Sequence, residues 1–130
     1  MTRRTYRGRV IWRGTANGEA LCSSEPLSFY GGIDLSSGVV TEQGHPLLGQ
    51  SVAGRVLVFP RGKGSTVGSY ALLRLAKQGL APAGLVMASC DTTVAVGAII
   101  AEVPCVDLLD LSELATGQRV VIEGEDVWTE

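Results

Sequence analysis

The sequence predicts a single α/β domain over residues 1–130, with a partly parallel sheet and a β-rich N-terminal half. Two observations predict this class. From residue 55 onward, apolar β-branched runs alternate with segments rich in helix formers, and strand–helix–strand order implies right-handed crossovers between parallel strands. Hydrophobic residues make up 45% of the chain and charged residues only 18%, so the 130 residues can bury one core.

In the N-terminal half we expect a β-hairpin followed by a long loop. Residues 7–14 have strand chemistry, residues 15–18 are typical of a turn, and residues 19–23 can return antiparallel to the first run. Residues 26–38 form either a plain surface loop or a loop that faces the functional site, because Gly31 and its neighbouring glycine permit a close backbone approach. The remaining expected elements of this half are a short strand at 39–41 and a turn at 44–49.

The C-terminal half is expected to alternate strands and helices. Residues 55–59 are an apolar, β-branched run typical of a buried strand, and residues 70–78 are rich in helix formers, with Gly79 as the C-terminal cap. Asp91, followed by two threonines, is a good N-cap for a short helix that contains residues 94–100. The other expected elements are strands at 84–88, 104–107 and 118–123 and a final short helix at 108–115.

Composition and charge argue against several classes of partner. A net charge of −2 does not favour nucleic acid, and an aromatic content of 5% leaves few side chains on which bases could stack. No apolar run reaches the roughly 18 residues of a membrane span. The basic N-terminus is not followed by the apolar core of a signal peptide. We therefore expect a cytoplasmic protein that binds neither nucleic acid nor membrane.

The cysteines do not form a recognisable metal site. Cys22, Cys90 and Cys105 are far apart in the sequence and odd in number, and His45 is the only histidine. Without a C-x-x-C pair or Cys/His ligand spacing, we expect reduced and largely buried thiols. An iron–sulfur cluster or other metal would have to be held mostly by another chain. His45 precedes a proline in a polar loop and has no visible orienting partner, which argues against a catalytic role.

The chain is organised around the loop between the strand at 55–59 and the helix that follows it. Residues 60–70 read PRGKGSTVGSY, with three glycines, two cations and a cluster of hydroxyl groups. Backbone N–H groups, the positive end of a helix dipole and the cations Arg61 and Lys63 all suit an anion. Ser65 is expected where the helix begins, either as its cap or as a hydroxyl held in the site. The alternative is a glycine-rich connection whose charges are simply solvated.

Known phosphate motifs do not match this loop. A Walker A loop needs Ser or Thr directly after its Lys, but Gly64 follows Lys63. The glycine spacing also misses the dinucleotide fingerprint by one residue, and no N-terminal β-α-β unit precedes it. Serine-nucleophile chemistry is not favoured, because no G-x-S-x-G elbow is present and His45 is the only candidate base.

Two stretches resemble the small subunit of the aconitase X family: residues 60–70 and residues 97–107, GAIIAEVPCVD. The resemblance covers nearly the whole chain and implies a swivelling β/β/α domain that closes over a larger subunit. It also implies that this partner holds iron or an iron–sulfur cluster, expected as 4Fe–4S, and that the chain is a stand-alone subunit rather than part of a fused form. The loop serine of the family, which matches Ser65, is taken as the base that removes a proton from substrate. The expected substrate-binding residues are Arg61, Gly62, Lys63, Gly64 and Thr66.

The resemblance implies a hydro-lyase that is active only with its large subunit. Removing a proton α to a carboxylate with a serine requires that N–H groups, a helix N-terminus or cations stabilise the alkoxide, and this loop offers all three. Two activities occur in the family: dehydration of phosphomevalonate to trans-anhydromevalonate 5-phosphate for isoprenoid synthesis, and dehydration of cis-3-hydroxy-L-proline. The short separate chain favours the first, although two cations do not decide between them. A non-catalytic binding module is the further alternative.

The split site predicts a surface that faces the partner. We expect residues 61–69 to cluster on one side of the molecule with residues 29–34 and with Asp91 and the two threonines after it. Tyr30 and Val67 should then be partly exposed in the isolated chain.

Overall fold

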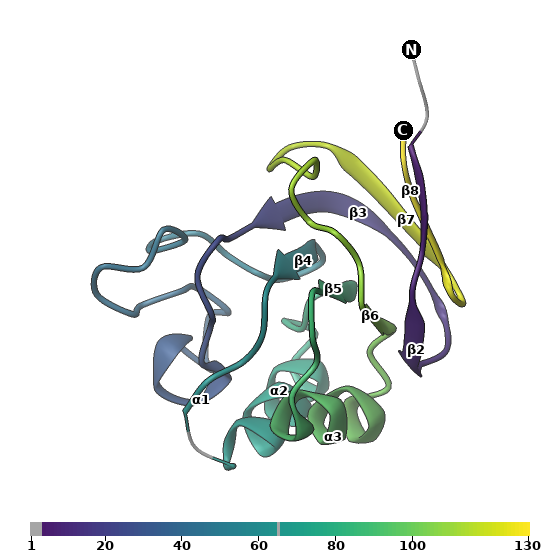
Figure 1. The fold of residues 1–130 in the computed structure, drawn as a ribbon. Helices are drawn as coiled ribbons and strands as arrows, with labels where there is room; N and C mark the ends of the chain where they lie inside the picture. The colour runs from purple at the N-terminus through teal and green to yellow at the C-terminus, as the bar shows by residue number, and fades with distance from the viewer. Residues whose placement is uncertain (1–3, 65) are drawn as a thin grey trace.

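The computed structural model describes residues 4–64 and 66–130, and these form one mixed sheet with helices on one face (Figure 1). The sheet has eight strands in the order β1-β8-β7-β3-β4-β5-β6-β2. The strands are β1 (Thr5–Arg7), β2 (Arg9–Trp12), β3 (Thr15–Cys22), β4 (Val56–Phe59), β5 (Gly84–Met87), β6 (Cys105–Asp107), β7 (Arg119–Glu123) and β8 (Asp126–Thr129). The helices are α1 (Phe29–Gly32), α2 (Gly68–Lys77) and α3 (Thr92–Ala101). The predicted α/β class with partly parallel pairing is confirmed.

The long strand β3 joins two β layers. Its first part pairs antiparallel with β7, and its last part, from Ala20 to Cys22, pairs parallel with β4. Strands β3, β4, β5 and β6 run parallel, whereas β7, β8 and β1 form an antiparallel layer on the side away from α2 and α3 (Figure 1). The order of layers is therefore β/β/α, which is the arrangement that the resemblance implied.

Every residue of β4 and β5 is buried, because each of these strands carries a core on both faces. Leu57, Phe59 and Met87 pack against Leu72 and Leu75 of α2 on the helical side. On the other side, a second apolar cluster combines alternate residues of the parallel strands with the antiparallel layer: Val56, Val58, Val86, Val106, Val120, Ile122 and Val127. The apolar runs that predicted buried strands therefore serve two cores.

The predicted N-terminal hairpin is wrong. Asn17 and Gly18, expected in its turn, lie inside β3 and pair with Val121 and Val120 of β7. A Cβ atom on Gly18 would lie 2.9 Å from the carbonyl oxygen of Gly54. This glycine therefore permits a close approach between strand and loop rather than a turn, and long-range pairing overrides the local turn signal.

The C-terminal segment also differs from the prediction. No helix forms between residues 108 and 115; Leu108 has a positive φ of 64°, and Asp110 Oδ1 instead accepts the N–H of Ser112 at 3.0 Å in a local turn. The strand at 118–123 is present as β7, but β8 was not predicted. Gly124, with φ of +60°, makes the tight turn that lets β8 pair with β7.

The elements around the glycine-rich loop were predicted well. Helix α2 begins at Gly68, after the expected cap position and two residues before the run of helix formers at 70–78, and Gly79 follows it with φ of +73°, as a C-terminal glycine should. Asp91 caps α3 through its carboxylate, as predicted. Residues 39–41 make only isolated bridges instead of a strand, and the turn at 44–49 is present. Among the described residues, no helix is long and apolar enough to cross a membrane.

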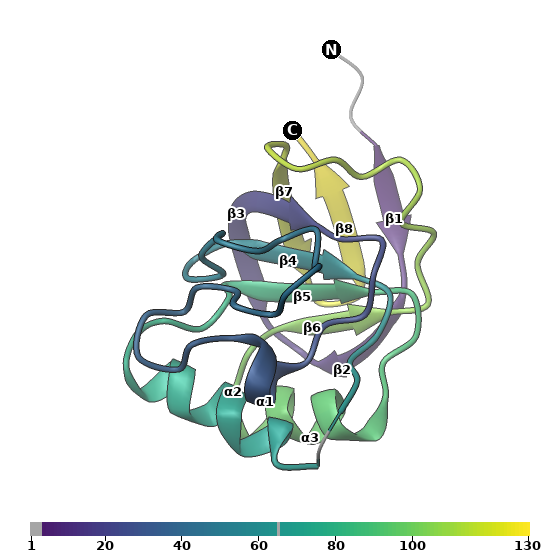
Figure 2. The same ribbon diagram turned by 90° about the vertical axis from the view of Figure 1, so that its left-hand side faces the viewer.

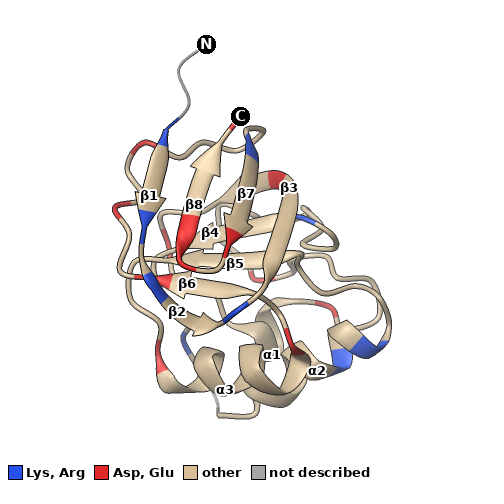
Figure 3. Ribbon diagram, turned by 90° about the vertical axis from the view of Figure 1, so that its right-hand side faces the viewer, with Lys and Arg blue, Asp and Glu red and all other residues tan. Residues whose placement is uncertain are grey.

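Charged residues are mixed over the antiparallel layer. Figure 3 shows Lys and Arg interspersed with Asp and Glu along β1, β2, β7 and β8. Several of them pair across strands, as Arg7 does with Asp126 at 3.1 Å. Charges of both signs therefore lie on the strands of this side of the molecule.

Candidate active site

The glycine-rich loop leaves the carboxyl end of β4 and enters α2 at Gly68. The carboxyl ends of parallel strands are the common location of ligand sites in open α/β sheets. Helix α2 has no acidic residue in its first turn and carries Arg74 and Lys77 in its last turn, so its dipole is not neutralised by a carboxylate at the N-terminus. Ser65, the predicted base, lies outside the described residues.

Two segments hold the start of the loop from opposite sides. Leu27 forms a parallel bridge with Gly62: its N–H donates to the carbonyl of Arg61 at 3.2 Å, and its carbonyl accepts the N–H of Lys63 at 3.3 Å. The N–H of Gly62 itself donates to Asp91 Oδ1 at 2.7 Å. Gly62 is buried, whereas its neighbours Arg61 and Lys63 are exposed. The two cations are therefore displayed on either side of a fixed glycine.

Gly64 is required by its backbone and by its surroundings. Its φ of +94° favours glycine, and a Cβ atom would lie 2.8 Å from Ser28 Oγ. Ser28 is the residue before α1, and its hydroxyl donates to the carbonyl of Tyr30 at 2.6 Å. The loop at 61–64 therefore packs closely against the segment that precedes α1.

The two cations differ in their surroundings. Lys63 Nζ lies 2.7 Å from Glu42 Oε2, a contact that sequence reasoning did not foresee. In the described part of the chain, the side chain of Arg61 has no hydrogen-bond or ion-pair partner. Arg61 is therefore available to an incoming anion, whereas Lys63 has to leave or share a carboxylate first. Thr66 is exposed, and its carbonyl accepts the N–H of Ser69 at 3.3 Å.

The three segments expected on one face do lie together. Figure 2 shows α1 beside α2, and α2 packs against α3. The Ser69 hydroxyl donates to the carbonyl of Thr93 at 2.7 Å, which joins the first turns of α2 and α3. Tyr30 is 52% exposed and Val67 43%, and Tyr70 beside them is 68% exposed. The clustering and the partial exposure are confirmed, and Leu27 and Ser28 of the 26–38 segment contact the glycine-rich loop.

His45 has a structural role. Its ring is buried, and Nδ1 accepts the N–H of Leu47 at 3.1 Å. Nε2 therefore carries the proton and donates to the carbonyl of Pro26 at 3.0 Å. Both ring nitrogens are used to join the turn at 44–49 to the segment before α1, which explains why the sequence offers no catalytic partner for this histidine.

The cysteines are thiols in largely apolar surroundings. Cys105 is buried, and the pKa of its thiol is raised by a hydrogen bond with Cys90 and by burial. Burial also raises the pKa of the Cys22 thiol. Cys22 and Cys90 are half-buried, so the expectation of largely buried cysteines holds fully only for Cys105. Within residues 4–64 and 66–130, no group of three or more His, Cys, Asp or Glu side chains could hold a metal ion.

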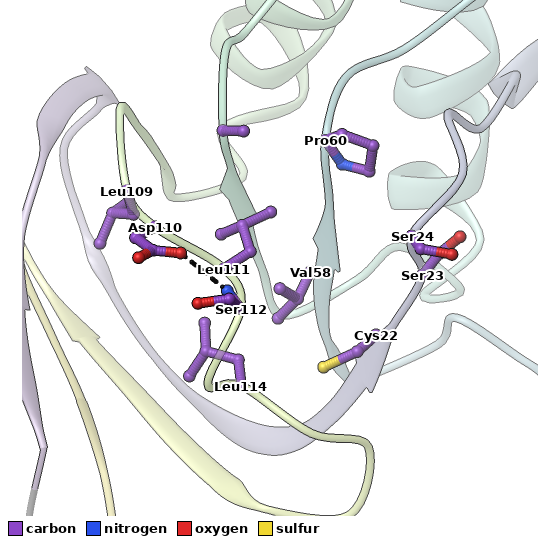
Figure 4. Close-up of a pocket in the computed structure, with 11 residues that line it drawn as sticks. Cys22, Ser23, Ser24, Val58, Pro60, Leu109, Asp110, Leu111, Ser112 and Leu114 are labelled. Atoms are coloured by element: carbon purple, nitrogen blue, oxygen red, sulfur yellow. Dashed lines mark hydrogen bonds between the residues drawn. The ribbon is translucent and has the colours of Figure 1, made fainter.

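A cavity of about 500 Å³ lies on the opposite face of the parallel strands from the helices. Figure 4 shows Cys22 and Ser24 on one side of it and the segment from Leu109 to Leu114 on the other, with Val58 between them. Among the described residues that line this cavity, Asp110 is the one charged residue, and none is Lys or Arg. This cavity therefore does not suit a phosphate or carboxylate, whereas the glycine-rich loop does.

Comparison with known protein families identifies the family of this chain. The family model described as the aconitase X swivel domain matches residues 5–129, almost the whole chain. The chain belongs to the aconitase X swivel-domain family. The resemblance seen in residues 60–70 and 97–107 is therefore confirmed over the full domain.

Relatives of this swivel domain carry a common name. It is 50% identical over 120 residues to the phosphomevalonate dehydratase small subunit of Thermococcus onnurineus, with 92% of each chain covered. The protein of the same name from Archaeoglobus fulgidus is 49% identical over 125 residues, covering 94% of each chain. That from Methanosarcina mazei is 46% identical over 128 residues, covering 96% of this chain and 89% of the relative.

Solved structures agree with the fold of the swivel domain. The crystal structure of Thermococcus kodakaraensis aconitase X in its holo-form superposes with a TM-score of 0.96 at 45% identity, covering 98% of both chains. A relative solved in solution by NMR superposes with a TM-score of 0.87 at 47% identity, covering 95% of this chain and 97% of the other. The β/β/α layers described above are therefore those of an aconitase X swivel domain.

Proposed function

We propose that this chain is the small subunit of a two-chain hydro-lyase that dehydrates (R)-5-phosphomevalonate to trans-anhydromevalonate 5-phosphate. The observation that carries the proposal is that relatives at 45–50% identity, matched over about nine-tenths of both chains, are named phosphomevalonate dehydratase small subunits. The conversion removes a proton α to a carboxylate and the hydroxyl at the β carbon, so it needs a base, a cradle for anions and a group that withdraws the hydroxyl.

The glycine-rich loop supplies the cradle in this proposal. Arg61 is exposed and can bind a carboxylate or phosphate through its planar guanidinium, and Lys63 adds a second positive charge at the cost of its contact with Glu42. Gly62, Gly64 and Thr66 are the other proposed substrate-binding residues of this loop. Ser65 is proposed as the base, whose alkoxide the N-terminus of α2 and the two cations would stabilise.

The iron–sulfur cluster that the family implies does not fit the residues of this chain. The described residues hold no set of three or more ligating side chains, because Cys90 and Cys105 lie together without a third ligand. We therefore assign the cluster to the larger subunit. This chain contributes the proton-removing loop and closes over the partner, with Tyr30, Val67 and Tyr70 on the face that meets it.

Co-expression with the larger aconitase X subunit tests the proposal. The purified complex is expected to dehydrate phosphomevalonate, and the isolated chain is expected to dehydrate nothing. Cis-3-hydroxy-L-proline is the competing substrate in the same assay. Turnover of the hydroxyproline alone would reassign the substrate, and turnover by the isolated chain would overturn the split site. A complex that forms but dehydrates neither compound would favour a binding module.

A further inference from the structure

The glycine-rich loop is tied at both ends to the first turn of α3. At its start, the N–H of Gly62 donates to Asp91 Oδ1 at 2.7 Å. At its end, the Ser69 hydroxyl donates to the carbonyl of Thr93 at 2.7 Å. Because both contacts are made by residues within one helical turn, the position of the loop depends on the position of that turn.

Asp91 uses its two carboxylate oxygens for two different elements. Oδ2 accepts the N–H of Val94 at 3.3 Å and caps α3, whereas Oδ1 takes the shorter bond from Gly62. A carboxylate that accepts a backbone N–H makes a stronger bond than a neutral acceptor does. The local sequence requires only the cap, which many short polar residues could provide. The second bond is the one that reaches the loop.

The contact between Asp91 and the loop also depends on Gly62 being a glycine. A Cβ atom at this position would lie 2.5 Å from Val94 Cγ2 and 2.9 Å from Asp91 Oδ1. The loop backbone therefore lies directly on the cap of α3, with no room for a side chain between them.

The residue before Asp91 is fixed by a buried carboxylate. The N–H of Cys90 donates to Asp107 Oδ2 at 2.7 Å. Asp107 is completely buried and accepts two bonds from Arg9, at 3.0 and 2.8 Å. The segment that carries Asp91 is thus fixed to β6 and β2, and these contacts hold the Asp91 carboxylate in position against Gly62.

We propose that Asp91 is a positioning residue for the glycine-rich loop, and this inference rests on the proposed function of that loop. Asp91 does not touch substrate; it acts through Gly62, whose two neighbours are Arg61 and Lys63. Fixing Gly62 fixes the Cα positions from which both cations reach the anion. Misplacing a binding group by about 1 Å can cost about 10²-fold in rate. The hydrogen bond from Gly62 to Asp91, which we call the clamp, should therefore affect turnover.

Asp91→Ser separates the clamp from the cap. Serine caps helices about as well as aspartate, but Val94 and Gly62 use different oxygens of Asp91, and the shorter serine has one oxygen that cannot occupy both positions. In the complex, we expect kcat/KM to fall by about 10- to 100-fold while the thermal midpoint of the small subunit changes little. Asp91→Asn keeps the shape of the side chain but has one acceptor oxygen. Its kcat/KM should lie between those of Asp91→Ser and the wild type. Asp110→Ser is the matched control, since it removes a similar local acceptor from the turn at Ser112 and should leave turnover unchanged.

Amide hydrogen exchange of the full chain provides a readout that does not need substrate. The Gly62 amide should exchange about 10- to 100-fold faster in Asp91→Ser, as the loss of a charge-assisted hydrogen bond implies, while amides of α3 keep their protection. Unchanged exchange at Gly62 would overturn the clamp. Faster exchange with wild-type kcat/KM would overturn its role in positioning. If the wild-type complex has no dehydratase activity, the proposed function fails, whereas the exchange experiment still decides whether the clamp exists.

Discussion

The Lys63 ammonium lies 2.7 Å from the Glu42 carboxylate, so one of the two loop cations is already paired before any substrate arrives. The side chain of Lys63 is 47% exposed and that of Glu42 24%, and pairs in such positions contribute only about 0–1 kcal/mol. An anionic substrate can therefore displace Glu42 at little cost.

Glu42→Gln is expected to lower KM for an anionic substrate in the two-chain complex by a few fold. The reason is that Lys63 would no longer have to leave a carboxylate, and an exposed pair is worth only about 0–1 kcal/mol. Glu19→Gln is the matched control, because it breaks the exposed pair with Arg55 at 2.6 Å, away from the loop. A higher KM in Glu42→Gln alone would mean that Glu42 orients Lys63 rather than competing for it.

Ser65→Ala is expected to reduce kcat by at least about 10²–10⁴, the range for a lost proton-transfer group. If Ser65 only caps the helix, the change should instead cost about 1 kcal/mol of stability and affect turnover little. Thr66→Ala controls for the neighbouring hydroxyl. Both complexes should assemble normally, which gel filtration can verify. Near-wild-type turnover by an assembled Ser65→Ala complex would remove serine as the base.

Tyr30→Glu is expected to weaken binding to the larger subunit by about 10- to 100-fold, as removal of an aromatic anchor from an interface typically does. Tyr30 is 52% exposed and lies on the face that carries the glycine-rich loop. Thr5→Glu places the same charge on the exposed edge strand β1 and should leave the affinity unchanged. Titration calorimetry with the purified partner measures both. Equal affinities for the two variants would move the interface to another face.

Asp107→Ala is expected to lower the free energy of unfolding by about 1–3 kcal/mol, because the partly buried N–H of Cys90 loses its acceptor and Arg9 loses its partner. Asp126→Ala is the comparison, since Asp126 pairs with Arg7 on the surface and should cost about 0–1 kcal/mol. Denaturant unfolding measures both changes. Similar losses in the two variants would contradict the role given to Asp107.

Cys105 should resist alkylation in the folded chain and react once the chain is unfolded. A hydrogen bond with Cys90 and, as the second cause, burial raise the pKa of this thiol above its ordinary 9.0. The thiol therefore stays neutral in the folded state. In the unfolded chain the thiol ionises near its ordinary pKa. The free energy of unfolding should therefore be constant with respect to this group below about pH 9 and should fall as pH rises further. Rapid labelling of Cys105 by iodoacetamide at neutral pH would show that the site opens.

Local patterns were sufficient for the elements around the loop. The buried run of β4, the helix formers of α2, the glycine after it and the Asp91 cap each depend on residues adjacent in sequence. The family signature in residues 60–70 also depends on adjacent residues, and the match of the family model to residues 5–129 agrees with it. Propensity, capping and motif spacing are local properties, so a single sequence carries them.

Two elements were predicted wrongly because other backbone partners outweighed the local pattern. Asn17 and Gly18 resemble a turn, but they lie within β3 because β7, about a hundred residues away, pairs with them. Residues 108–115 have no helix because Asp110 makes a local turn and the segment crosses the end of the parallel strands. In both cases a distant or competing backbone partner outweighs the local preference.

The sequence by itself determined the α/β class, the glycine-rich loop with its two cations and the family to which the chain belongs, because these follow from residues close together in the chain. Only the tertiary structure decided that β3 joins two β layers, that Glu42 pairs with Lys63, and that Asp91 reaches past its own helix to hold Gly62. Those contacts join residues 21 to 29 positions apart, or strands from opposite ends of the chain. Their formation depends on how the layers pack, and no local pattern encodes that packing.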